Sequence, residues 1–112
     1  MRRARHAARS LARQSGCGPA TVANVALAVS EAVSNAIIHG YAGRTGRIHL
    51  RAETDGGDFV ITVTDRGDGL TPRPDSPGLG LGLALIAQVT SDLHIDEPPG
   101  GGTRVRMAFP RA

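Results

Sequence analysis

The chain contains no lysine: all thirteen of its basic residues are arginine. A Walker A loop places a lysine against the phosphates of its nucleotide, and the common protein-kinase fold uses a lysine from a strand. Pyridoxal enzymes hold their cofactor through a lysine Schiff base. The absence of lysine therefore excludes these three kinds of site. A dinucleotide-binding loop is disfavoured as well, since no glycine completes a Gly-x-Gly-x-x-Gly pattern counted from Gly78 or Gly80.

Cysteine and aromatic residues are also scarce. Cys17 is the single cysteine, so the chain can form no internal disulfide and no cysteine-based zinc site. Two Phe, one Tyr and no Trp leave the core to Val, Leu, Ile and Ala. No apolar run reaches the length of a membrane span, and the arginine-rich start lacks the apolar segment of a signal peptide. We expect one domain spanning residues 1–112, with a modest core, in the reducing cytoplasm.

Positive charge is concentrated at the start of the chain. Five arginines precede residue 14, so the net charge of +3 leaves the remainder slightly acidic. Arg5, Arg9 and Arg13 share a helix face by their i+4 spacing. Such a face can dock nucleic acid or an acidic protein surface, although a solvated face is the commoner interpretation.

The segment from Glu31 to His39 places a carboxylate and an amide one helical turn apart in an otherwise apolar helix. Because residues at i and i+4 share a helix face, the side chains of Glu31 and Asn35 point to the same place. An apolar stripe at the spacing of a core-facing helix lies beside them. A charged group there needs a partner, which a metal ion with a phosphorylated ligand would supply. Alternatively, Glu31 lies at the polar edge of the helix and Asn35 is solvated beside it.

Two glycine clusters follow this helix in the sequence. Glycines at a strand end let a ligand approach the backbone closely. Glycines at a helix start expose N–H groups where the helix dipole favours anions. Either cluster alone is weak evidence, since turns are rich in glycine. The first is Asp65-Arg66-Gly67-Asp68-Gly69, at the end of a β-branched run, and the second is Gly78-Leu79-Gly80-Leu81-Gly82, before a helical pattern.

Periodicity predicts how the elements follow one another. The order is two helices, two strands joined by a glycine hairpin, an aperiodic loop, a third helix and two closing strands. This order predicts an α+β fold, a two-layer sandwich in which helices cover one face of a sheet. In the third helix, we expect Leu81, Leu85, Ile86 and Val89 to be buried. The predicted helices are 2–14, 19 to about 38 and 80–90, the strands are 47–54, 58–65, 93–96 and 103–109, and the loop is 68–77.

Four features occur in one order along residues 20 to 109: the Glu-x-x-x-Asn helix, the two glycine clusters, and Gly102-Thr103 at the last strand. This order resembles the N box, G1 box, G2 box and terminal Gly-Thr of the GHKL family of ATP-binding domains, which includes gyrase, histidine kinases and the heat-shock chaperone. The resemblance implies the Bergerat fold, with a mixed, largely antiparallel sheet under its helices. It also implies ATP and Mg²⁺ as cofactors.

The resemblance further implies a role for each matching side chain. Asn35 resembles the family's Mg²⁺ ligand, whose amide oxygen completes an octahedral shell of water and phosphate oxygens. Glu31 resembles the residue that polarises the attacking group in phosphoryl transfer. Asp65 resembles the adenine reader, because its carboxylate accepts a hydrogen bond from the exocyclic amine, where guanine has a carbonyl. Thr103 resembles the hydroxyl that joins Asp65 near the adenine, with an ordinary strand threonine as the alternative.

Other matching positions act through the backbone or the loop. Gly67 and Gly69 would let the chain pass close to the base, and residues 72–77 resemble the ATP lid. Arg66 and Arg73 could reach a phosphate, but nothing in their spacing requires it. The glycines whose amides would face the phosphates are Gly78, Gly80 and Gly82.

Within that family, the chain looks like the anti-sigma-factor serine/threonine kinases, because it lacks the dimerising helix pair with a phospho-accepting histidine that histidine kinases need. The branch implies a domain that binds ATP, captures a sigma factor and phosphorylates a serine on an anti-sigma-factor antagonist. Neither membrane nor direct nucleic-acid contact is expected, since no stacking aromatics accompany the arginine helix. A homodimer is possible, but Met1 stands at or inside the first helix. An N-terminal edge strand, and with it the usual dimer contact, could therefore be missing.

Two other functions stay open. One is an ATP-dependent module that sequesters its partner without phosphorylating it, and the other is a catalytic fragment of a histidine-kinase-like protein. Glu31 favours a kinase over a pure binding module, because a binding module needs no residue directed at the γ-phosphate. Chain length disfavours the histidine-kinase fragment.

Overall fold

The computed structural model describes residues 2–37, 46–66 and 79–111, with the side chains of 79–81 left aside. The helices and strands follow the predicted order, and their boundaries lie within one residue of the sequence-based ones with one exception. The second helix was expected to end at about residue 38, which lies outside the described residues, and α2 ends at Asn35. The elements are α1 (Arg2–Gln14), α2 (Pro19–Asn35), β1 (Ile48–Asp55), β2 (Asp58–Asp65), α3 (Leu79–Val89), β3 (Asp92–Asp96) and β4 (Thr103–Pro110).

The four strands form one sheet in the order β1-β2-β4-β3. Every pairing among these strands is antiparallel, whereas the resemblance implied a mixed sheet. The turn between β1 and β2 consists of Gly56 and Gly57, and Gly56 adopts a φ of 62° that suits a tight hairpin. β1 and β3 are the two edges of the sheet. The expected loss of an edge strand, and its effect on a homodimer, stay predictions.

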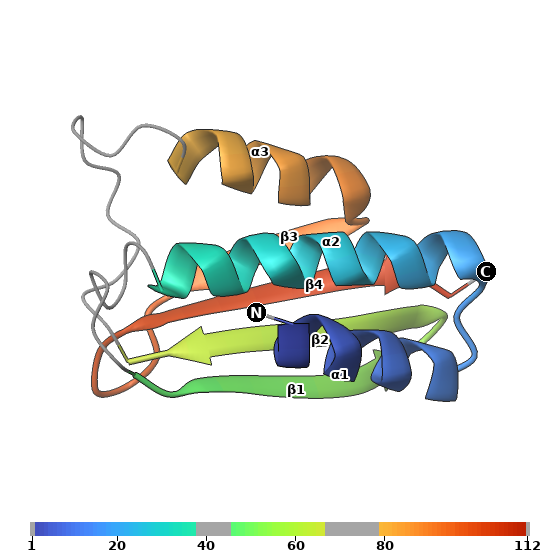
Figure 1. Cartoon of the computed structure of the whole chain (residues 1–112), viewed down its shortest axis with the longest axis horizontal. Coiled ribbons are helices and arrows are strands. Elements are labelled where there is room, and N and C mark those ends of the chain that lie inside the picture. The colour runs from blue at the N-terminus through green and yellow to red at the C-terminus, as the bar shows by residue number, and fades with distance from the viewer. Residues whose placement is uncertain (1, 38–45, 67–78, 112) are drawn as a thin grey trace.

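All three helices lie on one face of the sheet (Figure 1), which confirms the predicted two-layer sandwich. Alternate residues of β2 and β4 point toward the helices and form the core with the valines of α2. Ala8 and Ala12 of α1 are fully buried, and their small side chains allow close packing of α1 on the rest of the core. The largest fully buried side chains are Phe59, Phe109, Ile61, Ile86 and Met107.

One detail of α3 differs from the sequence-based expectation. Ile86 is fully buried and Val89 packs on the core, as predicted. Leu85 is only half-buried, whereas Leu83 packs on the core in its place. Leucines alternate with glycines at the start of this helix, so they point in many directions and the sequence does not define the buried stripe. Leu81 lies outside the described side chains.

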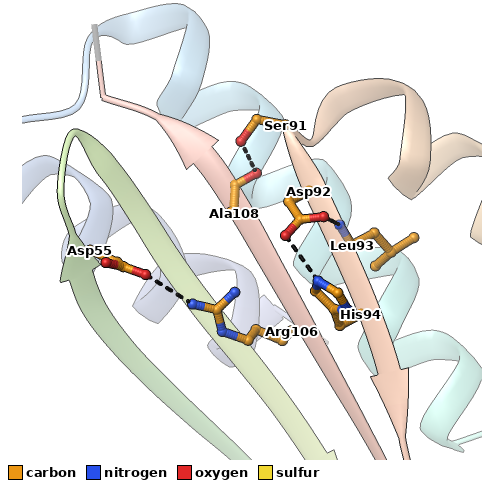
Figure 2. A network of polar contacts seen from close by, with 7 residues as sticks. All are labelled: Asp55, Ser91, Asp92, Leu93, His94, Arg106 and Ala108. Atoms are coloured by element: carbon orange, nitrogen blue, oxygen red, sulfur yellow. Dashed lines mark hydrogen bonds and ion pairs between the residues drawn. The ribbon is translucent and has the colours of Figure 1, made fainter.

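The face of the sheet away from the helices carries charged side chains. Arg104 donates two hydrogen bonds to Asp96, from Nε to Oδ1 at 2.8 Å and from Nη2 to Oδ2 at 2.6 Å. This hydrogen-bonded pair holds the pKa of Asp96 below its ordinary value. Figure 2 shows neighbouring contacts on β3 and a longer pair, Arg106 Nη2 to Asp55 Oδ2 at 3.5 Å. Because solvent screens exposed ion pairs, these contacts contribute little to stability.

The turn between α1 and α2 is closed by backbone hydrogen bonds. Gly16, with φ of 84°, donates to the carbonyl of Arg13, and Cys17 donates to the carbonyl of Ala12, both at 3.1 Å. These two bonds form a Schellman motif, which satisfies the last carbonyls of α1. Pro19 then occupies the first turn of α2, where a missing N–H costs nothing.

The elements define two ends of the molecule (Figure 1). At one end, which we call the motif end, the last turn of α2 and the first turn of α3 lie near the end of β2 and the start of β4. At the other, the hairpin end, the turn at Gly56 and Gly57 lies near the α1–α2 turn and Arg111. Among the described residues, no helix is long and apolar enough to cross a membrane.

Candidate functional site

Glu31 and Asn35 reach the same point on α3. A Cβ atom built on Gly82 would lie 3.3 Å from Glu31 Oε2 and 3.3 Å from Asn35 Nδ2. The i+4 spacing predicted that these two side chains would converge, and the structure confirms it. The sequence did not reveal that Gly82 lies opposite them. Glycine leaves room here, because a Cβ would lie in tight contact with both polar groups.

Asn35 is a buried polar residue, only 6% exposed. Its Nδ2 atom has no hydrogen-bond partner among the described residues. Such a group costs about 1–3 kcal/mol when it is left unsatisfied, so its retention needs an explanation. Rotation of the amide exchanges Oδ1 with Nδ2, so the same site can offer an oxygen ligand to a cation. Glu31 beside it is half-buried, which keeps its carboxylate accessible.

Asp65 and Thr103 face each other across the sheet at the same end. They are directly paired in the antiparallel register of β2 and β4, and they are 4% and 3% exposed. Asp65 and Thr103 each have an interaction partner within the chain. The predicted proximity of Asp65 and Thr103 is therefore confirmed, whereas their roles in adenine binding stay predictions.

Arg66 makes a contact that the sequence did not predict. Its Nη1 donates a hydrogen bond of 2.7 Å to the carbonyl of Pro99, in the turn between β3 and β4. The sequence allowed Arg66 to reach a phosphate without requiring it, and the structure places its guanidinium on this turn. The proline and glycine content of residues 98–102 signalled a turn, but nothing in the sequence linked that turn to Arg66.

The second glycine cluster lies only partly within the described residues. α3 begins at Leu79, so Gly80 and Gly82 lie in its first turn, at the end of the helix where the leading N–H groups have no acceptor within the helix. This placement is compatible with the predicted contact to phosphates. The remaining predictions lie outside the described residues: Gly67 and Gly69 near the base, Gly78 at the phosphates, the lid at 72–77, and Arg73 within that lid.

The residues present fit a nucleotide–metal ligand better than a protein-held metal. No three His, Cys, Asp or Glu side chains come together in the described part of the chain. A divalent cation here would therefore take few ligands from the protein and most from phosphate and water, as Mg²⁺ commonly does. Asn35, with its unsatisfied amide, is the residue that fits such a cation.

Two hollows at the hairpin end are poorer candidates for a site. One of about 300 Å³ is lined by Arg13, Cys17, Pro19 and Val22. Burial raises the pKa of the Cys17 thiol, although Arg111 opposes this effect, so the thiol stays protonated and poorly nucleophilic at neutral pH. The second, of about 350 Å³, lies beside it at the α1–α2 turn and is lined by Ser15, Gly16, Gly57 and Arg111.

The profile of the histidine kinase-like ATPase domain family matches residues 1–109. The chain therefore belongs to the histidine-kinase-like ATPase family, and the site at the motif end lies in an ATPase fold. Two similar curated proteins narrow the assignment. The anti-sigma F factor of Thermoanaerobacter sp. (strain X514) is 35% identical over 97 residues, which cover 77% of this chain and 68% of that protein. The anti-sigma F factor of Clostridium botulinum (strain Eklund 17B / Type B) is 36% identical over 98 residues, with the same coverage. Within the family, the chain falls in the anti-sigma-factor branch, as the sequence predicted.

Solved structures support the same fold. The histidine kinase domain of the blue-light-activated histidine kinase EL346 from Erythrobacter litoralis is similar, with a TM-score of 0.63 and 27% identity. That match covers 82% of this chain but 45% of the kinase domain, so the chain spans less than half of it. The ATP-binding domain of PrrB from Mycobacterium tuberculosis has a TM-score of 0.60 at 26% identity, covering 81% of this chain and 69% of that domain.

Proposed function

We propose that this domain is an ATP- and Mg²⁺-dependent serine/threonine kinase that binds a sigma factor and phosphorylates a serine on an anti-sigma-factor antagonist. The observation that carries the proposal is the convergence of Glu31 and Asn35 on Gly82 in the first turn of α3. Two polar side chains and a helix N-terminus meet there in a fold of the ATPase family. The buried pair of Asp65 and Thr103 lies at the same end of the sheet.

Each residue has a task that its chemistry allows. Bound ATP would supply the phosphoryl group. Asn35 would offer its amide oxygen to the cation, and Glu31 would accept a hydrogen bond from the serine hydroxyl and orient it for attack. Asp65 would accept a hydrogen bond from the exocyclic amine of adenine, with Thr103 beside it. The N–H groups of Gly80 and Gly82 would contact phosphate oxygens.

The partners are proposed from the relatives. Proteins named anti-sigma F factor share about a third of their aligned residues with this chain, and the name implies a sigma factor as partner. The exposed arginines of α1, Arg9 and Arg13 among them, offer a basic surface to such a partner. Among the described residues, the salt bridges between side chains that can be assigned do not involve the arginines of α1, so these are available for a contact between proteins.

One experiment tests the proposal directly. The domain is incubated with γ-labelled ATP, Mg²⁺ and a candidate antagonist protein, and labelled residues are identified by mass spectrometry. We expect transfer of label to a serine of the antagonist, and loss of this transfer in Glu31→Ala. A domain that binds ATP and retains a sigma factor, yet labels no antagonist, would instead be the sequestering module without kinase activity. Failure to bind ATP would overturn the whole proposal.

A further inference from the structure

The turn between β3 and β4 contains three consecutive glycines in the left-handed region. Gly100, Gly101 and Gly102 have φ of 90°, 95° and 93°. Because glycine loses more conformational freedom than any other residue when it is fixed, such a turn needs contacts to hold it in one shape. Within the turn, the amide of Gly101 donates to the carbonyl of Pro98 at 3.1 Å.

Arg66 provides a contact from outside the turn. Its Nη1 donates a hydrogen bond of 2.7 Å to the Pro99 carbonyl, and a Cβ built on Gly100 would lie 3.4 Å from the same atom. The guanidinium thus lies against the turn at the point where the glycine run begins. A hydrogen bond from a charged donor is stronger than one between neutral groups, so this contact can restrain the turn.

The backbone next to Arg66 supports the other end of the turn. A Cβ on Gly102 would collide with the carbonyl oxygen of Asp65 and would lie 2.8 Å from the Cα of Arg66. Gly102 therefore rests directly on the Asp65–Arg66 peptide, and the next residue, Thr103, pairs with Asp65. A shift of the turn at Pro99 would be transmitted through Gly102 to the side chain of Thr103.

We propose that Arg66 is a positioning residue for base recognition: it holds the glycine turn on the end of β2 and so keeps Thr103 beside Asp65. This inference rests on the proposed function, because it assumes that Asp65 and Thr103 contact adenine. It differs from a role as phosphate ligand in one measurable way. A phosphate ligand contributes to the binding of every nucleoside triphosphate, whereas a positioning residue for the base contributes to the preference for adenine.

The test compares two nucleotides on matched variants. ATP and inosine triphosphate carry the same phosphates and sugar, but inosine has a carbonyl in place of the exocyclic amine. Dissociation constants with Mg²⁺ are measured by calorimetry for the wild-type domain, Arg66→Ala, Arg66→Lys and Arg51→Ala. Arg51 is an exposed arginine of β1, on the face of the sheet away from the helices. Its removal therefore controls for the loss of one positive charge.

We expect Arg66→Ala to weaken ATP binding about threefold to tenfold, as for one lost hydrogen bond, and to change inosine triphosphate binding less than about twofold. Arg66→Lys, which keeps a charged donor, should recover part of the preference, and Arg51→Ala should match the wild type. Hydrogen exchange at the Gly101 amide should accelerate in Arg66→Ala, because the restraint on its turn is lost. Circular dichroism and thermal melts establish that each variant is folded.

Other outcomes would overturn the inference. An equal loss of affinity for both nucleotides makes Arg66 a phosphate ligand, and unchanged affinities with unchanged Gly101 exchange show that the contact positions nothing. If Arg66→Ala does not fold, the comparison between Arg66→Lys and the wild type decides the question. If the wild-type domain binds both nucleotides equally well, the adenine role of Asp65 is contradicted. That result would be a failure of the proposed function, and it is distinguishable from the outcomes for the Arg66 variants.

Discussion

The two ends of this sandwich differ in how completely their buried polar groups are hydrogen-bonded. At the hairpin end, the chain satisfies its own backbone: Gly18 donates to the Arg111 carbonyl at 3.1 Å, and the Arg111 amide donates to Gly57 at 3.2 Å. The Arg111 guanidinium adds longer contacts to the carbonyls of Ser15 and Gly56. At the motif end, Asn35 is buried with an unsatisfied amide.

This difference separates stability from function within one small fold. Buried polar groups are normally hydrogen-bonded, so an exception draws attention to a ligand or to chemistry. At the hairpin end, backbone and Arg111 hydrogen bonds hold the turns together and so contribute to the stability of the fold. The motif end combines Asn35 with a half-buried carboxylate at Glu31 and a glycine that makes room for both. Substitutions at the two ends should therefore affect different measurements.

The largest effects are expected at Glu31 and Asn35. Substitution of Glu31 should affect phosphate transfer, and substitution of Asn35 should affect nucleotide binding. Glu31→Ala should lower phosphate transfer by about a hundredfold or more, the usual contribution of a positioned acid–base group, and leave nucleotide affinity nearly unchanged. Asn35→Ala should weaken Mg²⁺-dependent nucleotide binding about tenfold, because a metal ligand is lost. Single-turnover transfer and calorimetry with and without Mg²⁺ measure these two quantities. Equal loss of binding in two folded variants would show that the roles are not divided.

Asp65→Asn should have the next largest effect. The substitution keeps the shape of the side chain but replaces an acceptor by an amide, so ATP binding should weaken about tenfold or more, as for a lost charge-assisted hydrogen bond. Titration calorimetry on the folded variant measures its dissociation constant for ATP. An affinity equal to that of the wild type would contradict the assignment of Asp65 to adenine.

At the hairpin end, Arg111→Ala should change stability and leave ligand binding intact. Its side-chain hydrogen bonds, at 3.3 and 3.5 Å, are long, so we expect the free energy of unfolding to fall by about 1 kcal/mol. Urea denaturation measures this loss. ATP affinity should stay within about twofold of the wild type, since these two hydrogen bonds at a remote turn do not touch the site. A large loss of ATP affinity would mean that the two ends are coupled.

The smallest effect is expected on α1. Replacing Arg9 and Arg13 by Glu should slow association with an acidic sigma-factor surface several-fold, because long-range attraction is replaced by repulsion. Salt should weaken this effect, since exposed charges are screened over a Debye length of about 8 Å at physiological ionic strength. ATP affinity should be unaffected. Partner on-rates measured across a salt series test this expectation. If the double variant keeps both the rate and the salt dependence, the arginines form a solvated face.

Local patterns in the sequence predicted the helices and strands, the convergence of Glu31 with Asn35, and the position of Asp65 at the end of a strand. The i+4 spacing was enough to bring Glu31 and Asn35 together, and the β-branched run ending at Asp65 defined the end of β2. These predictions needed only the geometry of a single helix or strand. The pairing of Asp65 with Thr103 came from the family resemblance, since strand register depends on contacts distant in sequence.

The remaining contacts could not be predicted because they join segments that carry no shared pattern. Gly82 lies against Glu31 only because α2 and α3 pack at a particular depth, and no periodicity encodes that depth. Arg66 and Pro99 are 33 positions apart, and their bond joins a side chain to a backbone carbonyl, which every residue possesses. Arg111 is a similar case, with a partner 96 positions away at Ser15.

The position of β4 has a consequence for how the domain is made in the cell. β4 follows the other strands in the sequence, yet it lies between β2 and β3. On the ribosome, β1 and β2 can form their hairpin early, whereas β3 must wait for β4 before it has a neighbour. The contact from Thr21 to Pro110 spans 89 positions and closes only then. Nascent chains should thus expose the apolar faces of α2 and β2 until synthesis has passed β4, and in that interval they depend on protection from aggregation.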